Sequence, residues 1–328
     1  MLDLQRPEGV QVFRDLLAGT DVFIQNFRPG VVERLGIDEP TLRTIRPDVI
    51  YVSVSGFGDT GPYIDQKSYD YVIQALSGMA ALQADSSGEP SLIRNVVIDK
   101  VTAYTAAQSV MAAIIARLRG HGGQHVRVSM IDVALAFLWP DGMMQHTLLD
   151  EATFTPGPLM ADNYLVRRAA DGHIALMATS NSQFPGLCAA LGTPQWLSDA
   201  RFATMDARKA NSVELNALIT VEVERYSGAE LVARLHAQDV PCASVNPIDQ
   251  AHLDPQVIHN ATLVDHVRPW LGRVREPRPP AHYSAKPTSL GRHAPKLDEH
   301  TDEVLAEFGR TPAQIADLRS RAVIGQRR

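Results

Sequence analysis

Asp48-Val-Ile-Tyr-Val-Ser-Val-Ser55 is the clearest strand in the sequence, because a short, nearly continuous apolar and β-branched run is typical of a buried strand. Further along, residues 102–118 place apolar side chains on one helical face, and Gly120-His-Gly-Gly123 is typical of a helix C-terminus. Residues 124–130 then indicate a second strand and residues 131–139 a second helix. Strand and helix in turn predict an α/β domain with a parallel, Rossmann-like sheet.

Upstream of this strand, the chain shows the same alternation. Residues 7–17 have the apolar spacing of a short amphipathic helix, and residues 21–26 form an apolar run of strand length. Arg28-Pro29-Gly30 ends that run. Residues 42–46 and 69–76 indicate two more helices.

After Pro140 the character of the chain changes. Residues 155–158, Thr-Pro-Gly-Pro, are linker-like, and Asp171-Gly172 between two short apolar runs predicts a β-hairpin. Helical patterns follow at residues 184–191, 212–226 and 229–238, and two more close the chain at 301–308 and 311–321. We therefore expect a large α/β domain at 1–150, a small α+β domain at 151–270, and an extended connection with helices at 271–328 that returns to the large domain.

Composition excludes several classes of protein. A net charge of −6 with 21% charged residues argues against non-specific electrostatic binding of nucleic acid. The only cysteines, Cys188 and Cys242, exclude a disulfide scaffold and a thiolate metal site. We see no continuous run of about 18 apolar residues and no apolar signal-peptide core, so we predict no membrane span and a cytoplasmic location.

Most familiar motifs fail when their structural context is considered. Residues 56–61 match G-x-G-x-x-G after a predicted strand, but Pro62 follows and no helical pattern resumes until Tyr69. A dinucleotide site needs a helix to begin at the glycines, so a loop is the better interpretation. The common zinc and serine-hydrolase signatures are absent, and we predict no metal site. The scattered histidines, His121, His125 and His146, are interpreted as loop or solvated residues.

Asp99 is the carboxylate of most interest. It ends an apolar run and precedes the long helix, where the partial positive charge of the helix end stabilises an anion. An ionised carboxylate there is placed to act as a nucleophile or a base. From position alone, a plain N-cap is the more frequent role of such an Asp.

Three stretches, taken in order, carry a family resemblance. They are Leu2-Asp-Leu with Asn26-Phe27-Arg28-Pro29-Gly30 and Arg34-Leu35-Gly36; Tyr51-Val-Ser-Val-Ser55-Gly-Phe-Gly58 with Gly61-Pro62-Tyr63 and Tyr69-Asp70; and Ile98-Asp99 with Gly122-Gly123-Gln124. The chain resembles the class III CoA-transferases, also called CaiB/BaiF, which include formyl-CoA:oxalate and carnitine CoA-transferases and, as a sister branch, α-methylacyl-CoA racemase. The likeness covers nearly the whole chain.

The resemblance implies a reaction on Asp99. The aspartate of this family attacks an acyl-CoA, forms a mixed anhydride and then an aspartyl-CoA thioester, and passes CoA to a carboxylic acid. Nearby backbone amides are expected to stabilise the oxyanions. Coenzyme A is a substrate in this chemistry, and no tightly bound cofactor or metal is implied.

The resemblance also implies the CoA contacts. Asn26, Phe27, Arg34 and Leu35 match residues along the CoA path, Leu2 matches a position near adenine, and Lys67 matches a lysine that binds phosphate. Gln5 departs from the pattern, since it replaces a basic residue.

Two rival functions follow from the same family. The racemase branch uses a histidine that falls here at Tyr69, and Tyr69-Asp70 supplies no imidazole base. We therefore expect a transferase, with Tyr69 and Asp70 shaping the acyl pocket. The second rival is a truncated, non-catalytic CoA-binding homologue, because family members begin with a further βαβ unit and Met1 falls on the stretch that follows it. A short form of this kind is expected to lack the first strands of the sheet and to expose apolar surface. The family also implies an interlocked homodimer.

Overall fold

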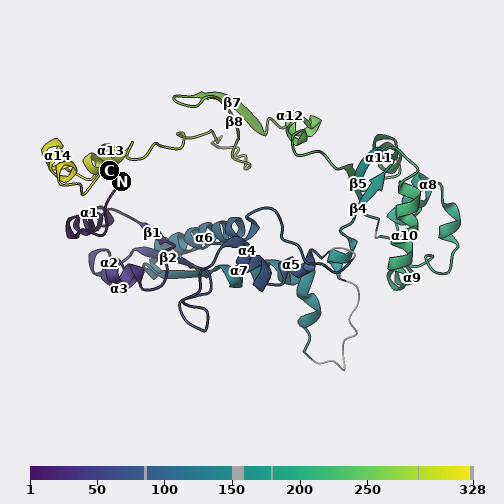
Figure 1. The fold of residues 1–328 in the computed structure, drawn as a ribbon, viewed down its shortest axis with the longest axis horizontal. Helices are drawn as coiled ribbons and strands as arrows, with labels where there is room; N and C mark the ends of the chain where they lie inside the picture. The colour runs from purple at the N-terminus through teal and green to yellow at the C-terminus, as the bar shows by residue number, and fades with distance from the viewer. Residues whose placement is uncertain (85–86, 150–158, 179, 287, 326–328) are drawn as a thin grey trace. The chain divides into compact units, whose positions relative to one another are not determined.

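The computed structural model describes residues 1–84, 87–149, 159–178, 180–286 and 288–325 (Figure 1). The chain divides into two compact units, one made of Met1–Thr147 with Ala294–Arg328 and the other of Leu148–His293. We describe each unit by itself. The linker-like residues 155–158 lie outside the described residues.

The first unit is built on a three-stranded sheet in the order β1-β2-β3, with β1 at Val22–Gln25, β2 at Ile50–Ser55 and β3 at His125–Ser129. Both pairs of strands are parallel, as predicted from the alternation of strands and helices. Register places Tyr51 beside Phe23 on one side and His125 on the other. Because side chains alternate along a strand, these aromatic rings share one face of the sheet. The valines that alternate with them along the strands lie on the opposite face.

Helix α6 covers the valine face. It runs over Val97–Ala116 and continues into a π-helical turn, η1, at Arg117–His121. Ala113 packs with Ile50 and Val52 in an apolar cluster that Val110 and Ile114 extend. Figure 1 shows α6 lying along the sheet.

Helix α6 corrects one expectation from the sequence. It begins five residues earlier than predicted, so Asp99 lies inside the helix and does not precede it. Residues 97–121 are also long and apolar enough to span a membrane, judged by length and composition alone. In this structure one side of the helix packs on β2, β3 and α7, while Tyr104 and Leu118 expose 74% and 79% of their surface.

Three short helices cover the other face of the sheet: α1 (Pro7–Leu17), α2 (Val31–Leu35) and α3 (Glu39–Ile45). Their apolar side chains surround Tyr51, whose hydroxyl donates to the Ile37 carbonyl at 3.1 Å. Burial raises the pKa of Tyr51 well above its usual value, so its phenol stays neutral. Asp38 caps α3 by accepting from the Thr41 amide at 3.0 Å.

The remaining helices of this part pack beside α6. They are α4 (Asp70–Leu76), α5 (Met79–Leu82) and α7 (Met130–Leu138), followed by the turns η2 (Trp139–Met143) and η3 (Met144–His146). Ile73, Met79 and Ile98 form their common core with residues of α7.

The end of the chain joins the beginning of the first unit. Helices α13 (Thr301–Glu307) and α14 (Pro312–Ser320) pack their apolar side chains against Val12 of α1. Leu2 pairs with Ile324 in an isolated β-bridge, and Arg321 forms an ion pair with Glu8.

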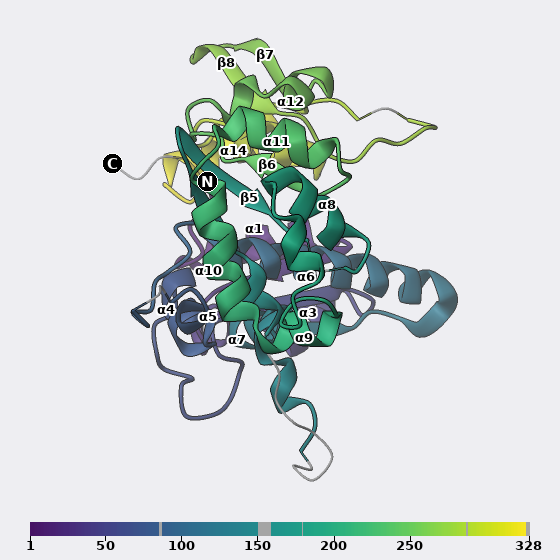
Figure 2. The same ribbon diagram turned by 90° about the vertical axis from the view of Figure 1, so that its right-hand side faces the viewer.

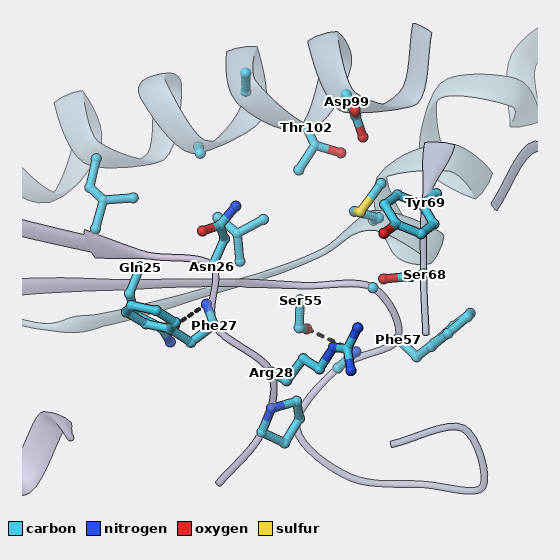
Figure 3. A pocket seen from close by; sticks show the side chains of 18 of the residues that line it. Gln25, Asn26, Phe27, Arg28, Ser55, Phe57, Ser68, Tyr69, Asp99 and Thr102 are labelled. Carbon is cyan, nitrogen blue, oxygen red and sulfur yellow. Dashed lines mark hydrogen bonds between the residues drawn. The ribbon is translucent and has the colours of Figure 1, made fainter. Parts of the chain in front are cut away.

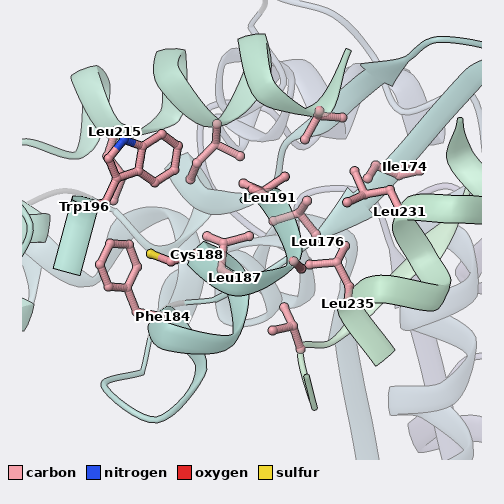
Figure 4. Packing of buried hydrophobic residues seen from close by; sticks show 14 of the residues in the cluster. Ile174, Leu176, Phe184, Leu187, Cys188, Leu191, Trp196, Leu215, Leu231 and Leu235 are labelled. Carbon is pink, nitrogen blue, oxygen red and sulfur yellow. The ribbon is translucent and has the colours of Figure 1, made fainter. Parts of the chain in front are cut away.

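The second unit has its own core, an antiparallel sheet β4-β5-β6 with helices packed on it (Figures 2 and 4). The predicted hairpin at Asp171-Gly172 is confirmed, because Ala169 of β4 pairs with Gly172 of β5. The strands are β4 (Val166–Ala169), β5 (Gly172–Leu176) and β6 (Cys242–Ser244), and the helices are α8 (Gln183–Leu191), α9 (Met205–Ala210), α10 (Ser212–Val223) and α11 (Gly228–His236).

A second antiparallel pair follows this core. Strands β7 (Leu263–Arg268) and β8 (Gly272–Pro277) form a hairpin after α12 (Pro255–His259). The 3₁₀ turns among the described residues of the unit are η5 (Met160–Asn163), η6 (Pro194–Leu197) and η7 (Ala251–Leu253). The division expected at residue 270 thus lies inside this hairpin, whose strands are hydrogen-bonded to each other. Part of the region predicted as an extended connection is therefore strand β8.

Candidate active site

A cavity of about 770 Å³ opens at the carboxyl ends of β1 and β2, beside the first turns of α6. The carboxyl edge of a parallel sheet is where α/β proteins commonly bind ligands. The cavity is lined by residues that follow β1, by residues that end and follow β2, and by one face of α6: Ile24–Pro29, Val54–Gly58, Ile64, Gln66, Ser68, Tyr69, Asp99, Thr102, Ala103, Ala106, Ala107 and Met130.

Asp99 points into this cavity from the first turn of α6 (Figure 3). Its side chain is accessible, and it is the third residue of the helix rather than an N-cap. Burial of the carboxyl group, with a smaller contribution from the negative charge of Asp70, raises the pKa of Asp99. The helix end favours the anion, but here the opposing influences are the larger. The carboxylate is therefore more basic than a solvated aspartate, which makes it a stronger nucleophile.

Asp70 holds the start of α6 in place. It is buried, and its Oδ2 accepts from the backbone N–H of Ile98 at 2.7 Å and of Asp99 at 3.0 Å. One turn later, Gln74 Oε1 accepts from the Ile93 amide at 2.9 Å, and Gln74 Nε2 donates to the Asn95 carbonyl at 3.2 Å. Helix α4 thus ties down the segment that precedes Asp99, and the position of Asp99 depends on α4.

The cavity brings together several residues that the sequence predicts as site residues. Asn26 and Phe27 follow β1, and Tyr69 precedes α4; all three line the cavity with Asp99. The Tyr69 ring stacks on Tyr71 at a centroid distance of 6.0 Å.

Five other predicted residues do not line this cavity. Leu2 lies at a separate cavity of about 310 Å³ beside α1 and α13, and Leu35 packs in the apolar cluster under the sheet. Arg34 and Lys67 are exposed, although Gln66 and Ser68 on either side of Lys67 do line the cavity. Asp70 lies in the interior, where it contacts the start of α6.

Sequence reasoning missed Thr102 as a site residue. It lies three residues after Asp99 on α6, and both side chains extend toward the cavity in Figure 3. Thr102 is 4% exposed, and its hydroxyl has no hydrogen-bond partner within the described part of the chain. Helical i, i+3 spacing would have identified it if the helix had been predicted to begin at Val97.

The glycine-rich residues 56–61 form a loop and start no helix, as predicted. The Ser55 hydroxyl accepts from the Gly58 amide at 3.0 Å, and Gly58 and Gly61 have φ of 96° and 102°. A Cβ on Gly56 would lie 2.1 Å from Ser68 Oγ. Only glycine therefore lets this loop close against Ser68 at the cavity wall.

The interpretation of His125 as a loop or solvated residue is wrong. His125 lies in β3, its ring is partly buried, and its Nε2 is 2.8 Å from Ser53 Oγ. Within the residues that the structure describes, no group of three or more His, Cys, Asp or Glu side chains could hold a metal ion.

Comparison with known proteins shows what the chain is similar to. The family model described as CoA-transferase family III matches residues 1–301. Succinate–glutarate CoA-transferase of Agrobacterium fabrum is 33% identical over 308 residues, which cover 93% of this chain and 77% of the relative. Human succinyl-CoA:glutarate CoA-transferase is 26% identical, with 99% and 75% covered. The crystal structure of a CaiB/BaiF family protein from Brucella suis is 30% identical, with a TM-score of 0.77 over 94% of this chain and 80% of that one.

Proposed function

This chain belongs to CoA-transferase family III, and we propose that it transfers CoA from an acyl-CoA to a carboxylic acid through a covalent intermediate on Asp99. The observation that carries the proposal is the accessible Asp99 carboxylate, which has a raised pKa and lies in a cavity of about 770 Å³ at the carboxyl edge of the sheet. A cavity of this size holds the reacting end of an acyl-CoA.

The exchange proceeds in four displacements. An Asp99 oxygen attacks the thioester carbonyl, the C–S bond breaks, and CoA leaves as a thiolate, which gives a mixed anhydride. The thiolate then attacks the Asp99 carbonyl carbon, so that the donor carboxylate leaves and an aspartyl-CoA thioester forms. The acceptor carboxylate attacks that thioester and releases the thiolate again. The thiolate finally attacks the acceptor carbonyl, which yields the new acyl-CoA and restores the Asp99 carboxylate. No net proton is consumed or released. The covalent route divides one difficult acyl transfer into easier displacements.

The oxyanions of these displacements need a donor other than the first amides of α6. The N–H groups of Ile98 and Asp99 already donate to Asp70, so these two amides are not free to fill the role that we expect of amides near the nucleophile. We propose the Thr102 hydroxyl, because it has no hydrogen-bond partner among the described residues and lies one helical turn from Asp99. Loss of a single oxyanion donor lowers kcat by about 10²–10³-fold in well-studied cases. We expect a loss of that order for Thr102→Val and near-normal turnover for Thr102→Ser.

We propose a dicarboxylic acid as acceptor. The relatives are named for succinate, glutarate, citramalate and malate, which are dicarboxylates. Arg28 lines the cavity and, within the described part of the chain, forms no ion pair. A guanidinium binds a carboxylate through two parallel hydrogen bonds, so Arg28 is suited to the distal carboxylate. In assays with glutarate and with valerate, the wild type should prefer glutarate, Arg28→Gln should lose that preference, and Arg28→Lys should keep part of it. An equal preference in the wild type and Arg28→Gln would exclude Arg28 from this role.

The remaining site residues are proposed as CoA contacts. Asn26 and Phe27, as cavity walls, would contact the pantetheine arm near the thioester. Arg34, Leu35, Lys67 and Leu2 would contact the phosphates and the adenosine, with the exposed Arg34 and Lys67 as the cations. We also propose an interlocked homodimer and a cytoplasmic location.

Trapping tests the covalent step. The protein is incubated with a panel of acyl-CoAs, treated with hydroxylamine, and digested for mass spectrometry. A hydroxamate on Asp99 is the expected product, and Asp99→Ala should abolish both the hydroxamate and CoA exchange while CoA binding remains. A hydroxamate on another residue, or none with any donor, would refute the mechanism. The racemase alternative is tested in D₂O, where deuterium exchange at the α-carbon of a 2-methylacyl-CoA without an acceptor would favour it.

A further inference from the structure

A second cavity shares a wall with the candidate active site. It measures about 250 Å³ and is lined by Gln25, Phe27, Arg28 and Pro29, which also line the first cavity. The segment 25–29 therefore forms a wall that borders both cavities, with Asn26 lining the first cavity only. A contact made with this wall on the side of the second cavity therefore also influences the shape of the first cavity.

Three hydrogen bonds run from this wall to β3. The Phe27 backbone N–H donates to Gln25 Oε1 at 2.7 Å (Figure 3). Gln25 Nε2 donates to Ser53 Oγ at 3.1 Å, and Ser53 Oγ lies 2.8 Å from His125 Nε2. Gln25 and Ser53 are paired neighbours on β1 and β2, and His125 lies on the same face of β3. We call these three hydrogen bonds the wall relay.

The direction of the second hydrogen bond follows from the first. A backbone N–H can only donate, so the Gln25 oxygen faces Phe27 and the Gln25 nitrogen must donate to Ser53. The Ser53 hydroxyl can either donate to His125 Nε2 or accept from it, depending on the tautomer of the ring. We assign the first direction, with a neutral ring that carries its proton on Nδ1, because it gives the Ser53 hydrogen an acceptor; the buried Nδ1 has no partner within the described residues.

We propose that His125 is a positioning residue, which holds the Asn26–Phe27 wall through the wall relay and releases it when the imidazole is protonated. The proposal rests on the proposed function, in which this wall contacts CoA. A protonated imidazole has no acceptor, so the hydroxyl hydrogen of Ser53, a residue that is 7% exposed, loses its partner. The Ser53 oxygen must then accept from both Gln25 and the ring while its own hydrogen is unpaired, which weakens the hold on Gln25 and Phe27.

The groups around His125 keep it neutral near pH 7. Burial is the largest influence and lowers the pKa of His125 below its ordinary value of 6.5. Arg127 on the same strand and Arg43 on α3 lower the pKa further, whereas Glu39 on α3 and Asp59 after β2 raise it. The Tyr51 ring contacts the imidazole edge-on, with centroids 4.9 Å apart. The wall relay is thus expected to form at neutral pH and to weaken on acidification, as the ring becomes protonated.

Calorimetric titration with CoA from pH 5 to pH 8 tests this inference. We expect the wild-type Kd to rise about three- to tenfold on acidification, as the loss of one hydrogen bond allows. His125→Phe keeps an aromatic ring but removes the nitrogen acceptor, so this variant should bind CoA weakly at every pH. His125→Gln keeps an acceptor that does not titrate, so it should bind tightly without a comparable fall at low pH. The matched control His121→Gln, at an exposed histidine four residues away, should behave as the wild type.

A second measurement does not depend on CoA binding. In NMR titrations of the His125 ring protons, Ser53→Ala should raise the pKa of His125, because a donor to the neutral ring is removed. Gln25→Glu should raise it more, because the new carboxylate accepts from Phe27 and from Ser53, and Ser53 can then accept from a protonated ring. An unchanged pKa in both variants would overturn the wall relay. If the wild type binds no CoA while both pKa shifts occur, the proposed function fails and the wall relay stands as a structural device.

Discussion

Asp70→Ala should detach the start of α6 and with it Asp99. The substitution removes the acceptor for the Ile98 and Asp99 amides, which lie 2.7 and 3.0 Å from Asp70 Oδ2. A hydrogen bond to a charged group contributes about 1.5–3 kcal/mol, and each buried donor left unpaired costs about 1–3 kcal/mol. Since water can reach part of a frayed helix end, we expect a loss of about 3 kcal/mol in the free energy of unfolding. Asp70→Asn keeps one acceptor oxygen and should lose about 1–2 kcal/mol.

Urea denaturation gives the free energy of unfolding, and hydrogen exchange read by mass spectrometry locates the change. In Asp70→Ala, a peptide that covers residues 97–103 should exchange faster, while peptides from β4 and β5 in the second unit should not change. The matched control is Asp65→Asn, which removes an exposed loop carboxylate. If Asp70→Ala and Asp65→Asn unfold at the same urea concentration, or if the start of α6 stays protected, then Asp70 does not hold Asp99 in place.

Three further outcomes follow from the cavity. Asp99 has a raised pKa in the folded protein, so its ionisation opposes folding; Asp99→Asn should be more stable than the wild type at pH 7, and a pH series of thermal unfolding should show the gain shrinking as the pH falls and Asp99 becomes protonated. Thr102→Val should leave the melting temperature unchanged or slightly higher, because it replaces a buried hydroxyl that has no partner in the part of the chain that the structure describes; a clear drop would mean that the hydroxyl is bonded. Gly56→Ala should cost about 1–3 kcal/mol by overpacking against Ser68, and adding Ser68→Gly should restore much of the loss in a double-mutant cycle.

Local patterns in the sequence predict the elements that local chemistry determines. The apolar run at residues 48–55 and the Asp171-Gly172 turn each carry their signal within a few neighbouring residues, and both elements are present. The start of α6 could not be predicted in this way. Its first amides are satisfied by Asp70, which lies 28 residues before Ile98 along the chain, so no capping residue marks the helix start.

The same distinction holds for the site. Asp99, Asn26, Phe27 and Tyr69 were predicted from a family resemblance, and they line one cavity. His125 was misinterpreted because its partner Ser53 is 72 residues away in the chain, and only the register of β2 and β3 brings the two together.

The packing of α1 against α13 and α14 has a consequence for biosynthesis. Val12 joins a cluster with Leu305 and Ile315, and Arg310 pairs with Asp15, which lies 295 residues earlier. At about 5–20 residues per second, a ribosome needs roughly 15–60 s to make the intervening chain. During that interval Val12 and Leu16 of α1 lack their partners from α13 and α14, although the intervening unit with its own core can already fold. The nascent polypeptide should therefore expose these side chains until synthesis ends, and its yield should fall when elongation slows late in the message.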